Sequence, residues 1–236
     1  MTLNCAHRGA SGHAPENTLA ALRLAVAMGA DMVEVDVQLS RDGQPVLIHD
    51  ETLDRTTSGT GPVAGQTMAE LSGLDAGSWL DPKWRDEKLP ALAEVLDRLG
   101  QRVLWNIELK DGASPELEDA VLKEIARAGC AERCLLTSFD HRRVLGLARR
   151  QAPVKLGCIV GFGCWQDALL DAPVQVLSLE RSLVDASLTG AARAAGKEVH
   201  VWTVNSAQEM RRLLDLGVDA VITNHPDIFQ TIRESG

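Results

Sequence analysis

The sequence lacks the features that mark nucleic-acid-binding and membrane proteins. Its 24 Lys and Arg residues are outnumbered by 33 Asp and Glu residues, for a net charge of -9, so it has no basic surplus with which to displace counterions from a nucleic-acid backbone. No apolar stretch reaches the length of a membrane-spanning helix, and the amino terminus has no basic region followed by an apolar run. We therefore expect a cytoplasmic protein that binds no nucleic acid and does not insert stably into membranes.

The sequence also lacks a cysteine pattern that predicts disulfide bonds. The residues are odd in number and scattered, which fits reduced thiols in a reducing compartment: Cys5, Cys130, Cys134, Cys158 and Cys164. The spacing of Cys130 and Cys134 would suit half of a zinc site, but no matching pair of ligands accompanies them. We interpret these two as structural thiols, with the zinc site as the alternative.

What is present indicates a packed α/β protein. Hydrophobic residues make up 45% of the 236 residues and no block is of low complexity, so a globular core is expected, and this length suits one α/β barrel or one doubly wound sheet. Strand and helix patterns alternate, which indicates a parallel sheet with right-handed crossovers. Strands are predicted at 3–6, 32–39, 45–48, 103–109, 135–138, 155–160, 174–179, 198–204 and 219–223, and helices at 18–28, 115–128, 140–150, 166–170, 185–195, 207–216 and from 226.

Nine strands are one too many for an eight-stranded barrel. If 45–48 is the antiparallel return of a hairpin, eight parallel strands remain, and polar residues follow many of them at the end where barrel active sites are built. We therefore predict a (β/α)8 TIM barrel and a single domain over 1–236. Residues from about 51 to 88, rich in Gly, Thr and Ser, break the rhythm and are predicted to form an insertion or lid without a core of its own.

Acidic residues interrupt the predicted strand at 32–39. Residues two apart share a face of a strand, so Glu34 and Asp36 point one way and the intervening valines the other. The connection SRDG is too short for a parallel crossover, so the return at 45–48 is predicted to be antiparallel and to bring His49 back towards the carboxylates. The alternative is an exposed hairpin with a polar face.

The predicted strand at 103–109 repeats this pattern. Asn106, Glu108 and Lys110 share one face, although barrel strands are normally apolar on both faces. Together with Glu34 and Asp36, Glu108 makes a set of three carboxylates that suits a hard divalent cation such as Mg2+ or Ca2+. The alternative is a group of acids that are paired with Arg or Lys.

Two histidines and two cations also lie at predicted strand ends. Either His7 or His49 alone would be interpreted as a structural histidine, but as a pair they can share the roles of general base and general acid near neutral pH. Arg8 and Lys110 supply the positive charges that a phosphate group needs.

These residues resemble the motifs of the glycerophosphodiester phosphodiesterase family, most closely its short, soluble bacterial members. Each motif is weak alone, but the ordered set from residue 7 to about 226 is highly specific: His7-Arg8-Gly9, Pro15-Glu16-Asn17-Thr18, Glu34-x-Asp36, Val46-x-x-His49-Asp50, Glu108-x-Lys110, Ser138-Phe139-Asp140 and Trp202-Thr203-Val204-Asn205. Asn224 is a departure, because many relatives carry Asp there, and this weakens any role for it.

The resemblance implies a TIM barrel and metal-dependent hydrolysis of glycerophosphodiesters to sn-glycerol 3-phosphate and an alcohol. It implies that Glu34, Asp36 and Glu108 hold the cation, Mg2+ or Ca2+ with Mn2+ as a further candidate, and that His7 and His49 are the acid and base. Water and the substrate's own 2-hydroxyl both remain candidates for the nucleophile.

The resemblance also implies roles for the cations and for one further acid. Arg8 and Lys110 would bind phosphate oxygens, Lys110 as part of the catalytic set, and Glu16 would join the same pocket, either near the metal or orienting Arg8. We further expect Trp202 to form an apolar wall under the glycerol and weigh the same role for Phe139; for both, packing at the barrel mouth is the alternative.

Two other functions remain as hypotheses. One is a phospholipase D-like activity on lysophospholipids, which the low aromatic content of 3% and the lack of a membrane-binding stretch count against. The other is a catalytically silent barrel that acts as a binding module, which the presence of both histidines, all three acids and both cations argues against. The sequence leaves open whether the barrel forms a homodimer.

Overall fold

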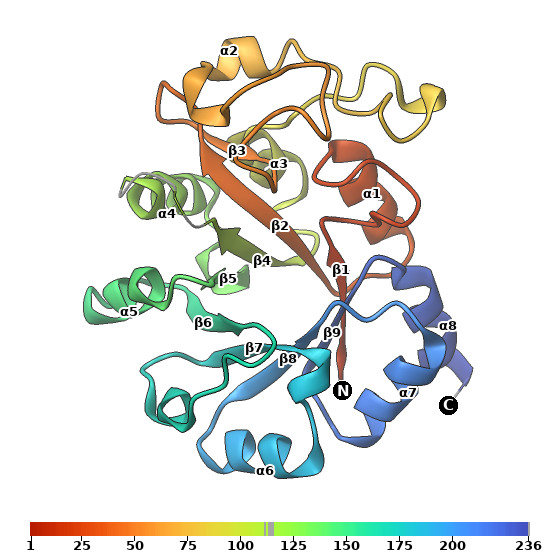
Figure 1. Ribbon diagram of the computed structural model, residues 1–236, viewed down its shortest axis with the longest axis vertical. Helices are drawn as coiled ribbons and strands as arrows, with labels where there is room; N and C mark the ends of the chain where they lie inside the picture. Colours follow the sequence, from red (N-terminus) through yellow and green to blue (C-terminus); the bar gives the residue numbers. More distant parts are fainter. Residues whose placement is uncertain (111, 113–115, 236) are drawn as a thin grey trace.

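A computed structural model describes residues 1–110, 112 and 116–235 and shows a closed barrel (Figure 1). In this part of the chain, parallel strands follow the order β1-β9-β8-β7-β6-β5-β4-β2, and β2 pairs with β1 to close the ring. The predicted (β/α)8 TIM barrel is thereby confirmed. The strands are β1 Leu3–His7, β2 Met32–Leu39, β4 Leu104–Leu109, β5 Cys134–Ser138, β6 Lys155–Val160, β7 Val176–Glu180, β8 Glu198–Trp202 and β9 Ala220–Thr223.

The ninth strand is the antiparallel return of a hairpin, as the short connection predicts. Strand β3 (Pro45–Leu47) pairs with β2 in the register Val37 to Leu47 and Leu39 to Pro45. The hairpin extends β2 beyond the barrel wall and leads the chain back towards the barrel mouth. His49 lies two residues after the end of β3.

Helices fill most of the connections between the strands. They are α1 Leu19–Ala27, α2 Met68–Leu71, α3 Leu92–Leu99, α4 Leu117–Ala128, α5 His141–Arg149, α6 Ala186–Ala194, α7 Ala207–Asp215 and α8 Pro226–Ser235. Short polar side chains cap several of them; the Oγ1 of Thr18, for example, accepts from the backbone N–H of Ala21 at the start of α1. Pro115, predicted to begin a helix, lies outside the described residues.

Two connections differ from the sequence-based expectations. Helix α3 provides the crossover from the hairpin to β4, although no helix is predicted there; its buried residues Leu92, Val95, Leu96 and Leu99 have helical spacing. After β6 the predicted helix is a 3-10 helix, Asp167–Asp171.

The alternation of side chains along the strands produces two separate apolar layers. Val33, Val35, Trp105 and Ile107 face outwards and form the main core with the helices. Inside the barrel a much smaller cluster of Cys5, Met32 and Ile222 lies below the polar residues, with Leu3, Leu104 and Trp202 packed against it. The helix-facing layer therefore carries most of the apolar burial, which leaves the inner faces of the strands free for polar side chains.

The segment 51–88 lies beside the hairpin at the top of the view in Figure 1. It contains α2 and the 3-10 helices Val63–Gly65 and Pro82–Trp84. Its buried residues Leu53, Val63 and Leu71 form one cluster with Val46 and Ile48 of the hairpin region. The segment thus has an apolar cluster, but one that it shares with the strand return.

Two predictions about cysteine and membrane helices can be compared with the structure. All five cysteines are free thiols, as expected, and the Sγ atoms of the buried Cys130 and Cys134 lie 3.8 Å apart. Neither belongs to a group of three or more metal-ligating side chains within the described residues, which favours the interpretation as structural thiols. In the same residues, no helix has the length and apolar character needed to cross a bilayer.

Candidate active site

A pocket opens at the carboxyl ends of the barrel strands. Residues from β1, β2, β4, β6, β7, β8 and β9 and from the loops after the strands line it: His7, Arg8, Glu34, His49, Asn106, Glu108, Phe139, Ile159, Ser178, Trp202, Thr203 and Ile222. The structure therefore brings seven of the ten site residues predicted from the sequence to one cavity wall. Asp36, Glu16 and Lys110 do not line the cavity, but each forms an ion pair with a residue that does.

Strand register aligns the three predicted metal ligands. His7 is in register with Glu34, and Asp36 is in register with Glu108. Since neighbours in register share a face of a sheet, the period-two pattern of each strand places all of these side chains on the inner side of the barrel. One oxygen from each of Glu34, Asp36 and Glu108 lies within 4.8 Å of the others.

Two of these carboxylates form ion pairs with Arg8 and Lys110, so the oxygens that remain free decide whether the cluster suits a metal ion. Asp36 lies 3.1 Å from Nε of Arg8 and 3.4 Å from Nζ of Lys110, and Glu108 lies 2.7 Å from Nζ of Lys110. Ion pairing, the alternative weighed above, therefore accounts for part of the cluster. Even so, Oε1 of Glu34 is buried without a hydrogen-bond partner, and Oδ1 of Asp36 has no hydrogen bond beside its ion pair with Lys110. The orphaned oxygen of Glu34, together with an all-carboxylate donor set, fits a hard divalent cation.

The electrostatics of the cluster support the same fit. Burial and the neighbouring charges of Asp36 and Glu108 raise the pKa of Glu34 well above its usual value. Burial and the charge of Asp36 likewise raise the pKa of Glu108 to about 7. Burial also opposes ionisation of Asp36, but Arg8 and Lys110 outweigh it and hold the pKa of Asp36 below its usual value. Arg8 and Lys110 therefore neutralise only part of the negative charge that the three carboxylates carry when ionised.

Arg8 is held between the acids of the pocket. Its backbone has a φ of 56°, in the left-handed region, and its N–H donates to Oε2 of Glu34 at 2.9 Å. Its Nη1 donates to Oε1 of Glu16, also at 2.9 Å, which is the contact expected if Glu16 orients Arg8. The next residue, Gly9, has to be glycine, because a Cβ there would lie 2.6 Å from the backbone carbonyl carbon of Ala21 in α1.

His7 is oriented by a residue at the opposite end of the chain. Its Nδ1 lies 2.7 Å from Oδ1 of Asn224, which also accepts from the hydroxyl of Ser11. Nε2 of His7 lies 4.0 Å from Oε2 of Glu34, on the pocket side. Burial and the nearby Arg8 lower the pKa of His7 to about 4, so the imidazole is neutral at neutral pH.

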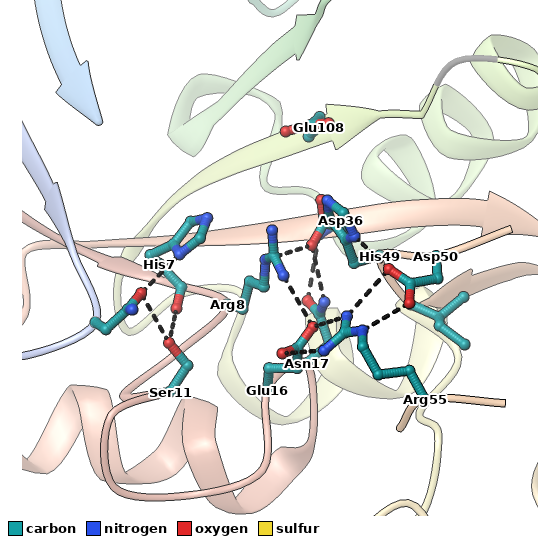
Figure 2. Close-up of polar contacts among 12 residues, drawn as sticks. His7, Arg8, Ser11, Glu16, Asn17, Asp36, His49, Asp50, Arg55 and Glu108 are labelled. Atoms are coloured by element: carbon teal, nitrogen blue, oxygen red, sulfur yellow. Dashed lines mark hydrogen bonds and ion pairs between the residues drawn. The ribbon is translucent and has the colours of Figure 1, made fainter. Parts of the chain in front are cut away.

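His49 is oriented by a second network, which Figure 2 shows. Its Nδ1 lies 2.6 Å from Oδ1 of Asp50. Arg55, from the segment 51–88, bonds to both carboxylate oxygens of Asp50 and to both of Glu16. Through Glu16 the network continues to Arg8. One guanidinium therefore connects the supports of a histidine and of an arginine in the pocket.

The aromatic residues predicted to line the site are present at its mouth. Trp202 donates from Nε1 to the carbonyl oxygen of Ser178 at 3.0 Å, and its ring meets that of Phe139 edge to face, with centroids 5.5 Å apart. Phe139 is 40% exposed. Trp202 also packs on the inner apolar cluster, so it both lines the pocket and contributes to packing.

Several supporting residues were not assigned from the sequence. Asn17 donates to Oδ2 of Asp36 at 2.9 Å, and its own amide oxygen accepts from the backbone N–H of Asp36. Asn224, Asp50 and Arg55 hold the histidines as described above. Asn17 and Asp50 lie inside the family motifs, so their positions carried a signal, whereas Arg55 had none. Asn224 was expected to have a weakened role because many relatives carry Asp there, but its Oδ1 lies 2.7 Å from Nδ1 of His7, so the amide keeps a contact with the pocket histidine.

Comparisons with known proteins identify the family of the chain. The family model described as the glycerophosphoryl diester phosphodiesterase family matches residues 7–228. A glycerophosphodiester phosphodiesterase of Caldanaerobacter subterraneus subsp. tengcongensis is 36% identical over 242 residues, which cover 100% of this chain and 99% of the relative.

Solved structures agree as well. A phosphodiesterase of Oleispira antarctica, in complex with the product sn-glycerol-3-phosphate, superposes with a TM-score of 0.89 at 33% identity and covers 98% of this chain and 96% of its own. A glycerophosphodiester phosphodiesterase of Agrobacterium tumefaciens has a TM-score of 0.87 at 32% identity, with 98% and 100% covered. The resemblance drawn from the motifs is confirmed: the chain belongs to the glycerophosphoryl diester phosphodiesterase family and is a phosphoric diester hydrolase.

Proposed function

We propose that the protein hydrolyses glycerophosphodiesters to sn-glycerol 3-phosphate and an alcohol with the help of a divalent cation. The observation that carries this proposal is the convergence of three carboxylates, two cations and two histidines on one pocket. This combination supplies what the reaction requires: positive charge to stabilise the negative charge of the phosphate, a proton acceptor and a proton donor.

Glu34, Asp36 and Glu108 would hold the cation, which supplies positive charge for a non-bridging phosphate oxygen when it is bound. Arg8 and Lys110 already neutralise part of the carboxylate charge and present further N–H groups to the phosphate. Mg2+, Ca2+ and Mn2+ all suit an oxygen donor set, so the ranking of these metals is part of the test.

The two histidines divide the proton transfers. His7 is neutral at neutral pH, and its Nδ1–H donates to Asn224, so Nε2 has a free lone pair on the pocket side. We assign it the role of general base, which takes the proton of the nucleophile, a water or the substrate's 2-hydroxyl, as that oxygen bonds to phosphorus. With the 2-hydroxyl as nucleophile, water then opens the cyclic phosphate to give glycerol 3-phosphate. His49 then acts as general acid and gives a proton to the alkoxide that leaves when the other phosphorus–oxygen bond breaks. Asp50 keeps its ring in place.

The single domain 1–236 is proposed to include the segment 51–88 as part of the catalytic unit. Arg55 of this segment bonds to Glu16 and Asp50, so the segment contributes to the supports of the pocket.

We also propose that the protein is cytoplasmic, and its free thiols support this location.

Release of glycerol 3-phosphate tests the proposal directly. Metal-stripped protein is assayed with glycerophosphodiesters of several head groups after addition of Mg2+, Ca2+ or Mn2+, and a cyclic glycerol phosphate is sought by phosphorus NMR to identify the nucleophile. We expect metal-dependent release with at least one head group. Release that is equal with and without added metal would contradict the metal part, and no release at all would contradict the reaction.

A second candidate is hydrolysis of lysophospholipids, and one observation favours it. Phe139 at the pocket mouth is 40% exposed, and Phe162, in the loop after β6, is 80% exposed. An acylated glycerophosphocholine that is turned over faster than the deacylated compound would establish this alternative.

A further inference from the structure

We propose that His13, His225 and Asp227 form a second metal site that takes a borderline divalent ion such as Zn2+. His13 lies in the loop after β1, His225 follows β9, and Asp227 is in the first turn of α8. Each offers one ligand atom, and these atoms lie within 4.8 Å of one another. None of the three belongs to the carboxylate cluster or lines the pocket.

The two imidazole rings already have the spacing that a shared ion requires. Their centroids are 5.3 Å apart and the ring planes are at 89°. Two histidines that bind one tetrahedral zinc ion at about 2.0–2.1 Å would have ring centroids roughly 5 Å apart. The rings therefore need no large movement to share an ion.

Close packing fixes the position of His225 before an ion arrives. A Cβ at Gly12 would lie 2.4 Å from Cε1 of His225, so the ring occupies space that only glycine leaves free. The N–H of Gly12 also donates to the carbonyl oxygen of Asn224 at 2.9 Å. These contacts join the loop that carries His13 to the loop that carries His225, and such preorganisation lowers the cost of binding.

The donor set distinguishes this site from the catalytic one. Two imidazoles and one carboxylate suit Zn2+ or Co2+, whereas Mg2+ and Ca2+ prefer oxygen ligands. The side chains of His13 and Asp227 are 34% and 41% exposed, so an ion can enter from solvent and keep a water molecule as its fourth ligand. Nε2 of His13 lies 2.9 Å from Oδ1 of Asp227, and the ion would replace this hydrogen bond and its proton.

The site lies next to the support of a pocket residue. Asn224, directly before His225, accepts from Nδ1–H of His7, and Ser11, two residues before His13, bonds to both Asn224 and His7. An ion shared by His13 and His225 would therefore hold together the two loops that position His7.

Zinc titration of metal-stripped protein tests the proposal. Millimolar Ca2+ is included to occupy the carboxylates while the imidazoles stay free, and Zn2+ binding is followed by calorimetry, with the visible absorption of Co2+ as the report on tetrahedral nitrogen ligation. We expect the wild type to bind one Zn2+ per chain. The affinity should fall about 100-fold in His13→Gln and in His225→Gln. His141→Gln, a histidine change on α5, is the matched control and should bind as the wild type does.

The pocket histidines provide the remaining control. A His7→Gln/His49→Gln protein should keep the ion, because the proposed ligands are intact. The proposal is overturned if no Zn2+ binds in the presence of Ca2+, if binding survives in both His13→Gln and His225→Gln, or if only the pocket variant loses it. His13 is partly exposed, so its replacement is compatible with folding, and circular dichroism of each variant verifies this.

Discussion

Nδ1 of His7 and Oδ1 of Asn224 lie 2.7 Å apart across the first and last strands of the barrel. We predict that Asn224→Asp raises the pKa of His7 from about 4, because a carboxylate at this position favours the protonated imidazole. If neutral His7 is the base, the acid limb of the pH profile of kcat should move to higher pH.

Asn224→Ala is the control for that change. It removes the hydrogen-bond acceptor without adding charge, so kcat should fall about 10-fold or more, and the acid limb should move to lower pH, because the bond to Asn224 raises the pKa of His7. An unchanged pH profile in Asn224→Asp, measured at saturating metal, would show that His7 does not act as the base.

The histidines themselves should be essential. We expect His7→Ala and His49→Ala each to lower kcat by about 10²- to 10⁴-fold, the usual contribution of a positioned acid or base. Calcium binding, followed by calorimetry, should be retained in both variants because the carboxylates are untouched. A His49→Ala protein as active as the wild type would refute the proposed division of roles.

Arg55 is predicted to act as a positioning residue for the pocket. Its guanidinium bonds to Asp50 and Glu16 at once, and lysine has no planar fork with which to do so. Both Arg55→Lys and Arg55→Ala should therefore lower kcat by roughly 10- to 100-fold through misplacement of His49 and Arg8. The melting temperature should change little, because the Arg55 side chain is 44% exposed and such ion pairs add little stability.

Arg41 offers a matched comparison for Arg55. It lies in the turn of the hairpin, and its guanidinium bonds to Gly65 and Glu70 of the segment 51–88, neither of which lines the pocket. Arg41→Lys should leave kcat unchanged. If both arginine variants lose activity equally, the effect belongs to the segment as a whole and not to the Arg55 network.

Cation binding and pH should be linked through Glu108. Its pKa in the folded, metal-free protein is about 7, above the ordinary 4.5, so the folded state holds a proton that the unfolded state loses between these values. The free energy of unfolding of the metal-free protein should therefore fall as pH rises through this range. A bound cation takes the place of the proton, so the rise in melting temperature on addition of Ca2+ should be larger at pH 8 than at pH 5.

Glu108→Gln tests the origin of this effect. The amide cannot ionise, so the part of the pH dependence that Glu108 contributes and most of the calcium stabilisation should be lost, whereas the part that comes from Glu34, whose pKa is also raised, should remain. An equal calcium effect at pH 5 and pH 8 in the wild type would show that Glu108 is not a ligand or does not hold its proton to neutral pH.

Much of the barrel and its carboxylates follow from local pattern. The alternation in β2 places Glu34 and Asp36 on one face whatever else surrounds the strand, and the same holds for Glu108 in β4. The short connection before β3 likewise determines an antiparallel return. Helix α3 was not predicted, although its sequence carried the signal, because the spacing of its buried residues is helical.

The supports of the site could be decided only by the tertiary structure. Asn224 is 217 residues from His7, and they meet because β1 pairs with β9 when the barrel closes. Arg55 reaches Glu16 over 39 residues by the folding of a segment that has little regular structure. Strand periodicity is a local property of the backbone, so the amino-acid sequence determined which side chains face the barrel interior. Closure of the ring and the course of the loops depend on packing between distant segments, and these determined which partners hold each of those side chains in place.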